Sequence, residues 1–190
     1  MRKIIVTTWI TLDGFLAGSN GEMDWVMVDE TMGKYENDLL SSADTLILGR
    51  VTYQSFAGSW PYVPENPSAS EGEKEYARKL NSMRKIVFSK SLEKAEWNNS
   101  QLVKEVLPEE LAKMKQEPGK DMVIYGSASI VQTFTKLGLI DEYQLLVHPV
   151  VLGSGKPLFA GITEPAHLRL LQTKSFPSGV IGLYYTPQSK

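Results

Sequence analysis

The sequence contains no cysteine and only two histidines in 190 residues. The lack of cysteine excludes disulfides, thiolate metal ligands and cysteine nucleophiles, and it fits a reducing compartment, so we expect a cytoplasmic protein. His148 and His167 stand far apart, and His148 precedes Pro149 inside a predicted strand. Because a zinc site needs further ligands, we expect no metal ion.

The sequence also lacks a long apolar run and a basic cluster. No stretch approaches the roughly 20 apolar residues that span a bilayer, and Asp13 and several threonines interrupt the N-terminal apolar segment, unlike a signal peptide. The net charge is -2 and the lysines are scattered. We therefore expect neither a membrane nor a nucleic acid as a partner.

Two common motifs are also missing, one that carries a serine nucleophile and one that binds phosphate. There is no Gly-x-Ser-x-Gly elbow, which argues against a serine hydrolase of that type. The segment "GSG" at 153–155 is not followed by the Lys-Ser/Thr of a Walker motif, so we interpret it as a hairpin-like turn.

The composition, 42% hydrophobic and 22% charged, is that of an ordinary globular chain with enough apolar residues for a large core. At this length, one domain over residues 1–190 is expected.

Strand and helix patterns alternate over the first two thirds of the chain, and strand patterns follow one another in the last third. β-Branched runs predict buried strands, and helical spacing with capping residues predicts helices between them. This order predicts a largely parallel sheet extended by antiparallel strands at its C-terminal end. The expected strands are 3–9, 45–50, 84–90, 122–125, 142–151, 167–176 and 180–186; the expected helices are 26–40, 51–58, 73–80, 108–117 and 127–137.

Glycine, hydroxyl and basic residues follow three of the predicted strands, in "GRVTY" (49–53), "SK" (89–90) and "YGSAS" (125–129). In an open α/β sheet, ligands bind outside the carboxyl ends of the strands, near helix N-termini. We therefore expect these three loops to face one crevice.

The joint at Gly126 has two interpretations. Gly126 removes a side chain where the chain turns into a helix, and the free N–H groups beyond it would accept a phosphate, with Ser127 and Ser129 as additional donors. Alternatively, Ser127 or Ser129 is a simple N-cap and Gly126 a tight turn.

The basic residues at the other two strand ends also allow two interpretations each. Arg50, followed by Thr52, would bind a phosphate through its guanidinium or would pair with a neighbouring carboxylate. Ser89 and Lys90 offer a hydroxyl and an ammonium, or Lys90 is simply solvated.

Three aromatic residues near the glycine-rich loops have the same ambiguity. Trp25, Tyr53 and Trp60 would stack on a planar heterocycle or belong to the core.

Taken together, these segments resemble the dihydrofolate reductase-like superfamily. The resemblance is strongest to the reductase domain of bifunctional riboflavin-biosynthesis deaminase-reductases, and to small stand-alone bacterial members of that branch. It runs from residue 3 to about 159. The matching segments are "TLDGFLAGSNGEMDW", "LILGRVTYQSF", "KIVFSKSL" and "VIYGSASIVQTFTKLGLIDEYQLLVHPVVLGSGKPLF".

This resemblance implies a three-layer α/β/α fold around a mixed, mainly parallel sheet of about eight strands, with NADPH bound across the carboxyl ends. It implies phosphate contacts by Gly49, Arg50 and Thr52, and a grip on the 2′-phosphate by Ser89 and Lys90. The loop 13–25, including Ala17, is implied to cover the nicotinamide. The pyrophosphate is implied to lie against Tyr125, Gly126, Ser127, Ala128, Ser129 and Ile130.

The resemblance also implies a substrate site and a dimer. Asp13, with Trp25 and Tyr53, is implied to contact a heterocyclic substrate, and Asp13 is the candidate proton donor. The alternative is that Asp13 is an ordinary turn residue in Asp-Gly. The C-terminal strands are implied to form a homodimer.

The chain departs from both named enzymes at particular positions. The joint is Gly126-Ser127 where dihydrofolate reductases have two glycines. Gly33 falls near the position of their helix carboxylate, and the nearby Asp29, Glu30 and Glu36 are not clearly in register. The riboflavin enzymes carry lysine where this chain has Thr7 or Thr8, and glutamate where it has Tyr125.

We accordingly expect an NADPH-dependent reductase of a pyrimidine or pterin-like heterocycle. The nearest activity that the resemblance implies is 5-amino-6-(5-phosphoribosylamino)uracil reductase of riboflavin biosynthesis. The alternatives are a dihydrofolate reductase and a nucleotide-binding module without turnover.

Overall fold

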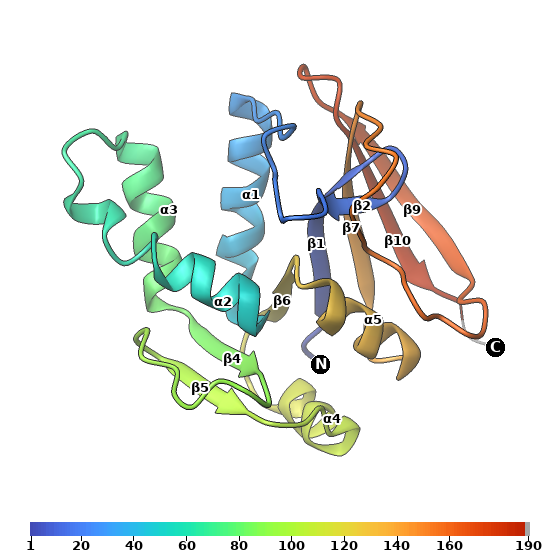
Figure 1. Cartoon of the computed structure of the whole chain (residues 1–190). Helices are drawn as coiled ribbons and strands as arrows, with labels where there is room; N and C mark the ends of the chain where they lie inside the picture. The colour runs from blue at the N-terminus through green and yellow to red at the C-terminus, as the bar shows by residue number, and fades with distance from the viewer. Residues whose placement is uncertain (189–190) are drawn as a thin grey trace.

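An eight-stranded sheet in the order β5-β4-β3-β6-β1-β7-β10-β9 crosses the molecule (Figure 1). The computed structural model describes residues 1–188. The strands from β5 to β7 in this order run parallel, and β10 and β9 are antiparallel to their neighbours. The strands are β1 Ile4–Thr11, β3 Ala43–Gly49, β4 Arg84–Phe88, β5 Ser100–Val103, β6 Asp121–Tyr125, β7 Glu142–His148, β9 Leu168–Ser175 and β10 Ile181–Pro187.

Two short strands and several helices complete the chain. Strands β2 (Phe15–Ala17) and β8 (Lys156–Pro157) pair separately from the main sheet. The helices are α1 Glu30–Ser42, α2 Arg50–Ala57, α3 Glu71–Ser82, α4 Pro108–Gln116 and α5 Ala128–Lys136, with a 3-10 turn at Val63–Glu65. The expected mixed, mainly parallel sheet with antiparallel C-terminal strands is confirmed. None of the helices in residues 1–188 has the length and apolarity needed to cross a membrane.

The sheet is covered on both faces because its strands are apolar on both faces. Ile4 and Val6 of β1 belong to one core cluster and Ile5 to another, as the two-residue period of a strand requires. Leu111 of α4 and Phe134 of α5 cover the first face. Residues of α1 and α3, among them Leu39, Leu40 and Leu80, cover the second, which makes three layers.

Helix α1 begins later than the predicted residue 26. The side chain of Asp29 accepts a hydrogen bond from the Met32 N–H (2.9 Å) and thereby caps a helix that starts at Glu30. The apolar residues before Asp29, such as Val28, lie in an exposed loop instead.

Strand β5 was not predicted from the sequence. Its residues Ser100–Val103 are half-buried or exposed and show no clear alternation. The strand exists because it pairs in parallel with β4, which is a tertiary contact that local sequence does not encode.

The second-face core contains a fully buried lysine. The Lys85 ammonium donates to the carbonyls of Asn81 (2.9 Å), Met83 (2.9 Å) and Asn98 (3.0 Å), and it lies 4.2 Å from the ring centroid of Trp97. Burial lowers the pKa of Lys85 to about 8, so the ammonium is largely protonated at neutral pH. It joins the end of α3 to the segment that leads into β5.

Replacing Lys85 with Met should lower the free energy of unfolding by about 3 kcal/mol, because the methionine fills the space but leaves the buried carbonyls without their donor. Urea denaturation measures the change. Lys34→Met on the exposed side of α1 is the matched control and should stay within about 0.5 kcal/mol of the wild type. A Lys85→Met protein as stable as that control would show that the ammonium contributes nothing.

Candidate functional site

The carboxyl ends of β4, β3 and β6 lie side by side at one edge of the sheet, because β3 pairs in parallel with both of the others. The three loops predicted to share a crevice therefore do meet. Helices α2 and α5 lie on either side of the end of β6 (Figure 1). We call this the strand-end cluster: Gly49, Arg50, Thr52, Ser89, Lys90 and residues 125–130.

Ser127 connects two of these loops. Its Oγ accepts a hydrogen bond from the Gly49 N–H (2.8 Å) and shares another with the Thr52 hydroxyl (2.9 Å). A Cβ on Gly49 would lie 2.8 Å from this Oγ, so only glycine permits the approach. Ser127 stands at the N-cap position of α5, but its side chain makes no capping bond. The interpretation of Ser127 as a simple N-cap is therefore wrong.

The joint itself consists of two successive left-handed residues, Gly126 (φ 51°) and Ser127 (φ 55°). The N–H groups of Ile130 and Val131 donate the first hydrogen bonds of the helix, to the Ser127 carbonyl. The N–H groups of Ala128 and Ser129 come before these bonds and have no partner within the helix. Together with the helix dipole, they make this end of α5 favourable for an anion. Ser129 is exposed and Ile130 is buried.

Arg50 is free to bind an anion. Its guanidinium donates to the Gln54 side chain one turn along α2 (2.9 Å) and is otherwise exposed. Within residues 1–188 it makes no ion pair with a carboxylate, which removes the alternative considered from the sequence.

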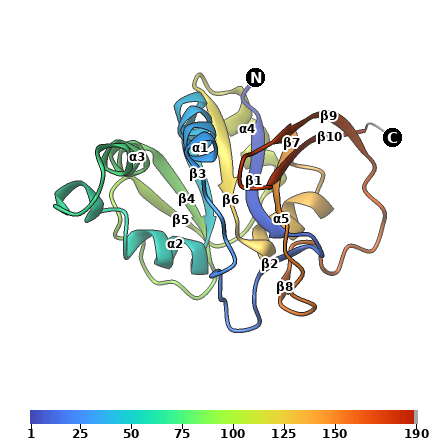
Figure 2. The same ribbon diagram turned by 90° about the horizontal axis from the view of Figure 1, so that it is seen from above.

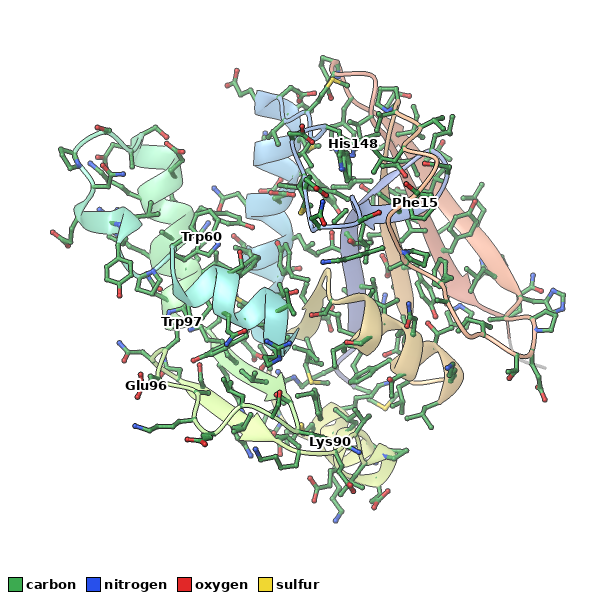
Figure 3. The ribbon with its side chains drawn as sticks, viewed as in Figure 1. Phe15, Trp60, Lys90, Glu96, Trp97 and His148 are labelled. Carbon is green, nitrogen blue, oxygen red and sulfur yellow. The ribbon has the colours of Figure 1, made fainter. Side chains whose placement is uncertain are left out.

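Ser89 and Lys90 have different parts in the loop after β4. The buried Ser89 Oγ accepts a hydrogen bond from the Leu92 N–H (3.0 Å) and so closes the turn. Lys90 is exposed and follows directly, at the foot of the view in Figure 3. The turn thus presents the Lys90 ammonium at the same sheet edge as Arg50.

Asp13 is fixed in a turn. Its carboxylate accepts hydrogen bonds from the Thr11 hydroxyl (2.6 Å) and from the N–H groups of Gly153 (2.7 Å) and Leu152 (3.3 Å). The hydrogen bond from Thr11, above all, lowers the pKa of Asp13. An ionised carboxylate with these donors favours the structural interpretation of Asp13 over the role of proton donor.

The loop after Asp13 is held against the 153–155 turn. Strand β2 pairs with β8, and a Cβ on Gly155 would lie only 2.3 Å from the Ala17 carbonyl oxygen. The "GSG" segment is therefore a turn packed against the buried Ala17.

Trp25 packs on the buried His148, with ring centroids 5.2 Å apart. The His148 ring nitrogens face the carbonyls of Leu146 (3.1 Å) and Met27 (3.2 Å), so the histidine fastens the loop to β7. In Figure 3, His148 lies in the upper part of the view, close to the loop that follows β1. Among the described residues, no three His, Cys, Asp or Glu side chains gather as a metal site would require.

Tyr53 is buried, and its contact with the substrate stays a prediction. Its hydroxyl accepts a hydrogen bond from the Trp97 N–H (2.9 Å), and the two rings lie 6.3 Å apart. Tyr53 and Trp97 line a cavity of about 470 Å³ on the outer side of α2, against the loop 92–98.

A group of half-buried aromatic residues lies on the sheet face covered by α1 and α3. Trp60 is 5.1 Å from Tyr76 and 6.2 Å from Phe56, and Phe56 is 6.0 Å from Tyr125, between ring centroids. Figure 3 shows Trp60 between α2 and α3. We call these four residues the aromatic belt, and Trp60 belongs to it rather than to the fully buried core.

A carboxyl group of α1 that the sequence did not place in register lies beside this belt. The Glu36 side chain of α1 accepts a hydrogen bond from the Trp9 indole N–H (2.7 Å). Burial raises the pKa of Glu36 to about 7, which the Trp9 bond only partly offsets. Burial, above all, raises the pKa values of Tyr35, Tyr76 and Tyr125, and the charge of Glu36 adds to this effect. We call these five residues the Glu36 cluster.

The sequence did contain a signal for Glu36. It falls between Met32 and Leu39 in the apolar stripe of α1, where a carboxylate is unexpected. The register expected for a helix carboxylate pointed instead to Gly33, which is exposed, and Asp29 is occupied as the cap of α1. Thr7 and Thr8, where the riboflavin enzymes have lysine, are both buried in β1.

The residues of the strand-end cluster suit a dinucleotide. Free N–H groups at the start of α5, a glycine that a Cβ would obstruct, and two exposed cations meet at one sheet edge. The pyrophosphate would lie against residues 126–129, and Arg50 and Lys90 would hold a further phosphate.

Two solved structures share the fold. A putative riboflavin biosynthesis protein from Shewanella sp. PV-4 has a TM-score of 0.78 at 22% identity, covering 99% of this chain and 100% of that one. A dihydrofolate reductase from Enterococcus faecalis, solved with NADP(H), has a TM-score of 0.64 at 14% identity, with 98% and 97% coverage. These likenesses confirm a dihydrofolate reductase-like fold.

Sequence comparisons cover nearly the whole chain. The uncharacterized protein YyaP of Bacillus subtilis is 40% identical over 184 residues, which are 97% of this chain and 94% of YyaP. The family model described as the RibD C-terminal domain matches residues 2–182. The fold is thus one of riboflavin-pathway-type reductases, and the chain belongs to the RibD C-terminal domain family.

Proposed function

We propose that this protein is an NADPH-dependent reductase of a nitrogen heterocycle or its ribosyl derivative. The nearest activity is reduction of 5-amino-6-(5-phosphoribosylamino)uracil. Membership of a reductase-domain family supports an oxidoreductase. The choice of cofactor and substrate rests on the chain's own residues.

The observation that carries the proposal is the Ser127 bridge. It brings the starts of α2 and α5 together at the carboxyl ends of adjacent strands, beside two exposed cations. Two helix N-termini and two cations suit a ligand with several phosphates, and a cation next to the ribose favours NADPH over NADH. The bound cofactor would supply a hydride, and the protein orients both partners and excludes water.

A nucleotide-binding module without turnover is the second candidate. Asp13, the sequence's candidate proton donor, is held as a hydrogen-bond acceptor with a lowered pKa, which makes it a poor acid. Dihydrofolate reductase activity has less support, because no carboxylate stands at Gly33 and Asp29 caps α1. NADPH binding without NADPH oxidation by any pyrimidine or pterin would establish the module.

Replacing Arg50 or Lys90 with Ala should weaken NADPH binding about tenfold and NADH binding less than twofold, since each loses one charge-assisted contact to a phosphate that NADH lacks. Quenching of tryptophan fluorescence measures both affinities.

Lys113→Ala is the matched control for charge. Lys113 is exposed on α4. The carbonyl of nearby Lys115 accepts a hydrogen bond from the Arg2 N–H, which places this part of α4 at the amino edge of the sheet. Equal losses for NADPH and NADH in the Arg50 and Lys90 variants would contradict a 2′-phosphate contact.

Replacing Ser127 with Ala should weaken NADPH and NADH alike by about five- to tenfold, because the two starts of α2 and α5 lose the hydroxyl that joins them. Isothermal titration calorimetry measures this loss. Ser55→Ala, on the exposed side of α2, serves as the control. Unchanged binding by Ser127→Ala would remove the main support for the cofactor site.

We also propose a homodimer through the C-terminal strands. Strand β9 is the edge of the sheet, visible at one margin of Figure 2, and Leu170 and Leu171 on it are exposed. Sedimentation should give twice the chain mass for the wild type and the chain mass for Leu171→Glu. A wild-type monomer at micromolar concentration would refute the dimer.

A further inference from the structure

The Glu36 cluster adjoins the strand-end cluster. Tyr125 directly precedes Gly126, and β1 aligns Thr7 with Tyr125, which places Trp9 two residues further along the same face of β1. All five residues of the Glu36 cluster are half-buried rather than enclosed in the core. A molecule beside the start of α5 would therefore meet Glu36 and the two tyrosines next.

The cluster keeps unused hydrogen-bonding capacity. One oxygen of Glu36 accepts from Trp9, and within the described residues its other oxygen makes no hydrogen bond. The Tyr76 hydroxyl donates to the Tyr125 hydroxyl (3.2 Å), which leaves the Tyr125 proton for another acceptor. The Tyr35 hydroxyl, by contrast, already donates its hydrogen bond to the Gln144 side chain.

We propose that Glu36, positioned by Trp9, and the Tyr76–Tyr125 hydroxyl pair grip the polar edge of the heterocyclic substrate, and that the Glu36 carboxyl delivers the proton of the reduction. The second part of this inference, the delivery of the proton by Glu36, rests on the proposed reductase function. The substrate class is a pyrimidinedione, a ring on which carbonyl and N–H groups alternate.

The chemistry of the cluster matches such an edge. A protonated carboxyl group both donates and accepts hydrogen bonds, and so does the Tyr125 hydroxyl. The pair can therefore hydrogen-bond to a carbonyl and to the N–H beside it. Phe56 and Trp60 of the aromatic belt offer ring faces next to them.

The proton balance is simple. Reduction of a C=N or C=O bond adds a hydride to the carbon and a proton to the nitrogen or oxygen. Bound NADPH would supply the hydride and would itself be oxidised to NADP⁺. Glu36 gives the proton from its free oxygen, becomes a carboxylate, and is reprotonated by solvent. A pKa of about 7 suits this cycle at neutral pH.

Within residues 1–188, no cation contributes to the pKa of Glu36 and offsets its burial. Lys79 of α3 is bonded to Asn37 and paired with Glu75, and Lys174 of β9 lies over the rings of Tyr35 and Phe176. The ionisable neighbours are the tyrosines of the cluster and Tyr184 of β10, which lies beside Tyr35. The two causes that set the Glu36 pKa are its burial and the Trp9 hydrogen bond.

The test begins without any ligand. The infrared carbonyl band of a protonated carboxyl group should disappear with a midpoint near pH 7 in the wild type, and this transition should be absent in Glu36→Gln. Trp9→Phe removes a hydrogen bond that lowers the pKa, so its midpoint should move to higher pH. A wild-type midpoint near pH 4.5 would overturn the assignment.

The second part uses 5,6-diaminouracil as the probe in the presence of saturating NADPH. Glu36→Gln should weaken its binding at least tenfold and Tyr125→Phe about fivefold, with NADPH affinity unchanged within twofold. NADPH oxidation by 5-amino-6-(5-phosphoribosylamino)uracil should fall at least a hundredfold in Glu36→Gln. Glu30→Gln, an exposed carboxylate in the first turn of the same helix, is the matched control and should change none of these.

The outcomes separate the two proposals. Failure of the wild type to bind NADPH defeats the proposed function but leaves the infrared transition of Glu36 in place. Normal NADPH binding, with 5,6-diaminouracil bound equally by wild type and Glu36→Gln or not bound at all, overturns the assignment of Glu36 and the tyrosines.

Discussion

The hydroxyl of Ser127 is the contact on which the arrangement of the candidate site depends. By accepting from Gly49 and sharing a hydrogen bond with Thr52, it ties the β6–α5 joint to the β3–α2 joint. Without it, the Gly49 N–H and the Thr52 hydroxyl would lose the acceptor that joins the starts of the two helices. Gly49 must lack a side chain for the approach, and the left-handed residues Gly126 and Ser127 turn the chain to make it.

That joint also fixes what stands next to it. Tyr125 ends β6 immediately before the turn, so its ring joins the aromatic belt and its hydroxyl meets Tyr76 of α3. Glu36 of α1 lies at the same place, although it is distant in sequence from both Tyr76 and Tyr125. The raised pKa of its carboxyl follows from burial beside aromatic rings, a common way of keeping an acid protonated near neutral pH.

Two carboxylate positions that the resemblance singles out have different outcomes in the structure. Asp13 is present but serves as an acceptor for the 152–153 turn, which holds the loop that contains Ala17. The first-helix carboxylate is absent at Gly33, and a different carboxyl group, one turn further along α1, lies among tyrosines. The candidate site of this chain is therefore described by which groups converge at the strand ends, and single matching positions do not reveal it.

Sequence alone determined most elements of this protein and the sheet edge where its candidate site lies. Apolar runs, glycine joints and capping residues predicted the strands, most of the helices and the meeting of three strand ends, because these signals are local and repeat with the period of each element. Only tertiary structure decided that β5 exists, that Ser127 bridges two loops instead of capping its helix, that Tyr53 is buried, and that burial raises the pKa of Glu36. Each of these depends on contacts between residues far apart in the chain, and the burial that shifts a pKa arises only when those residues pack together.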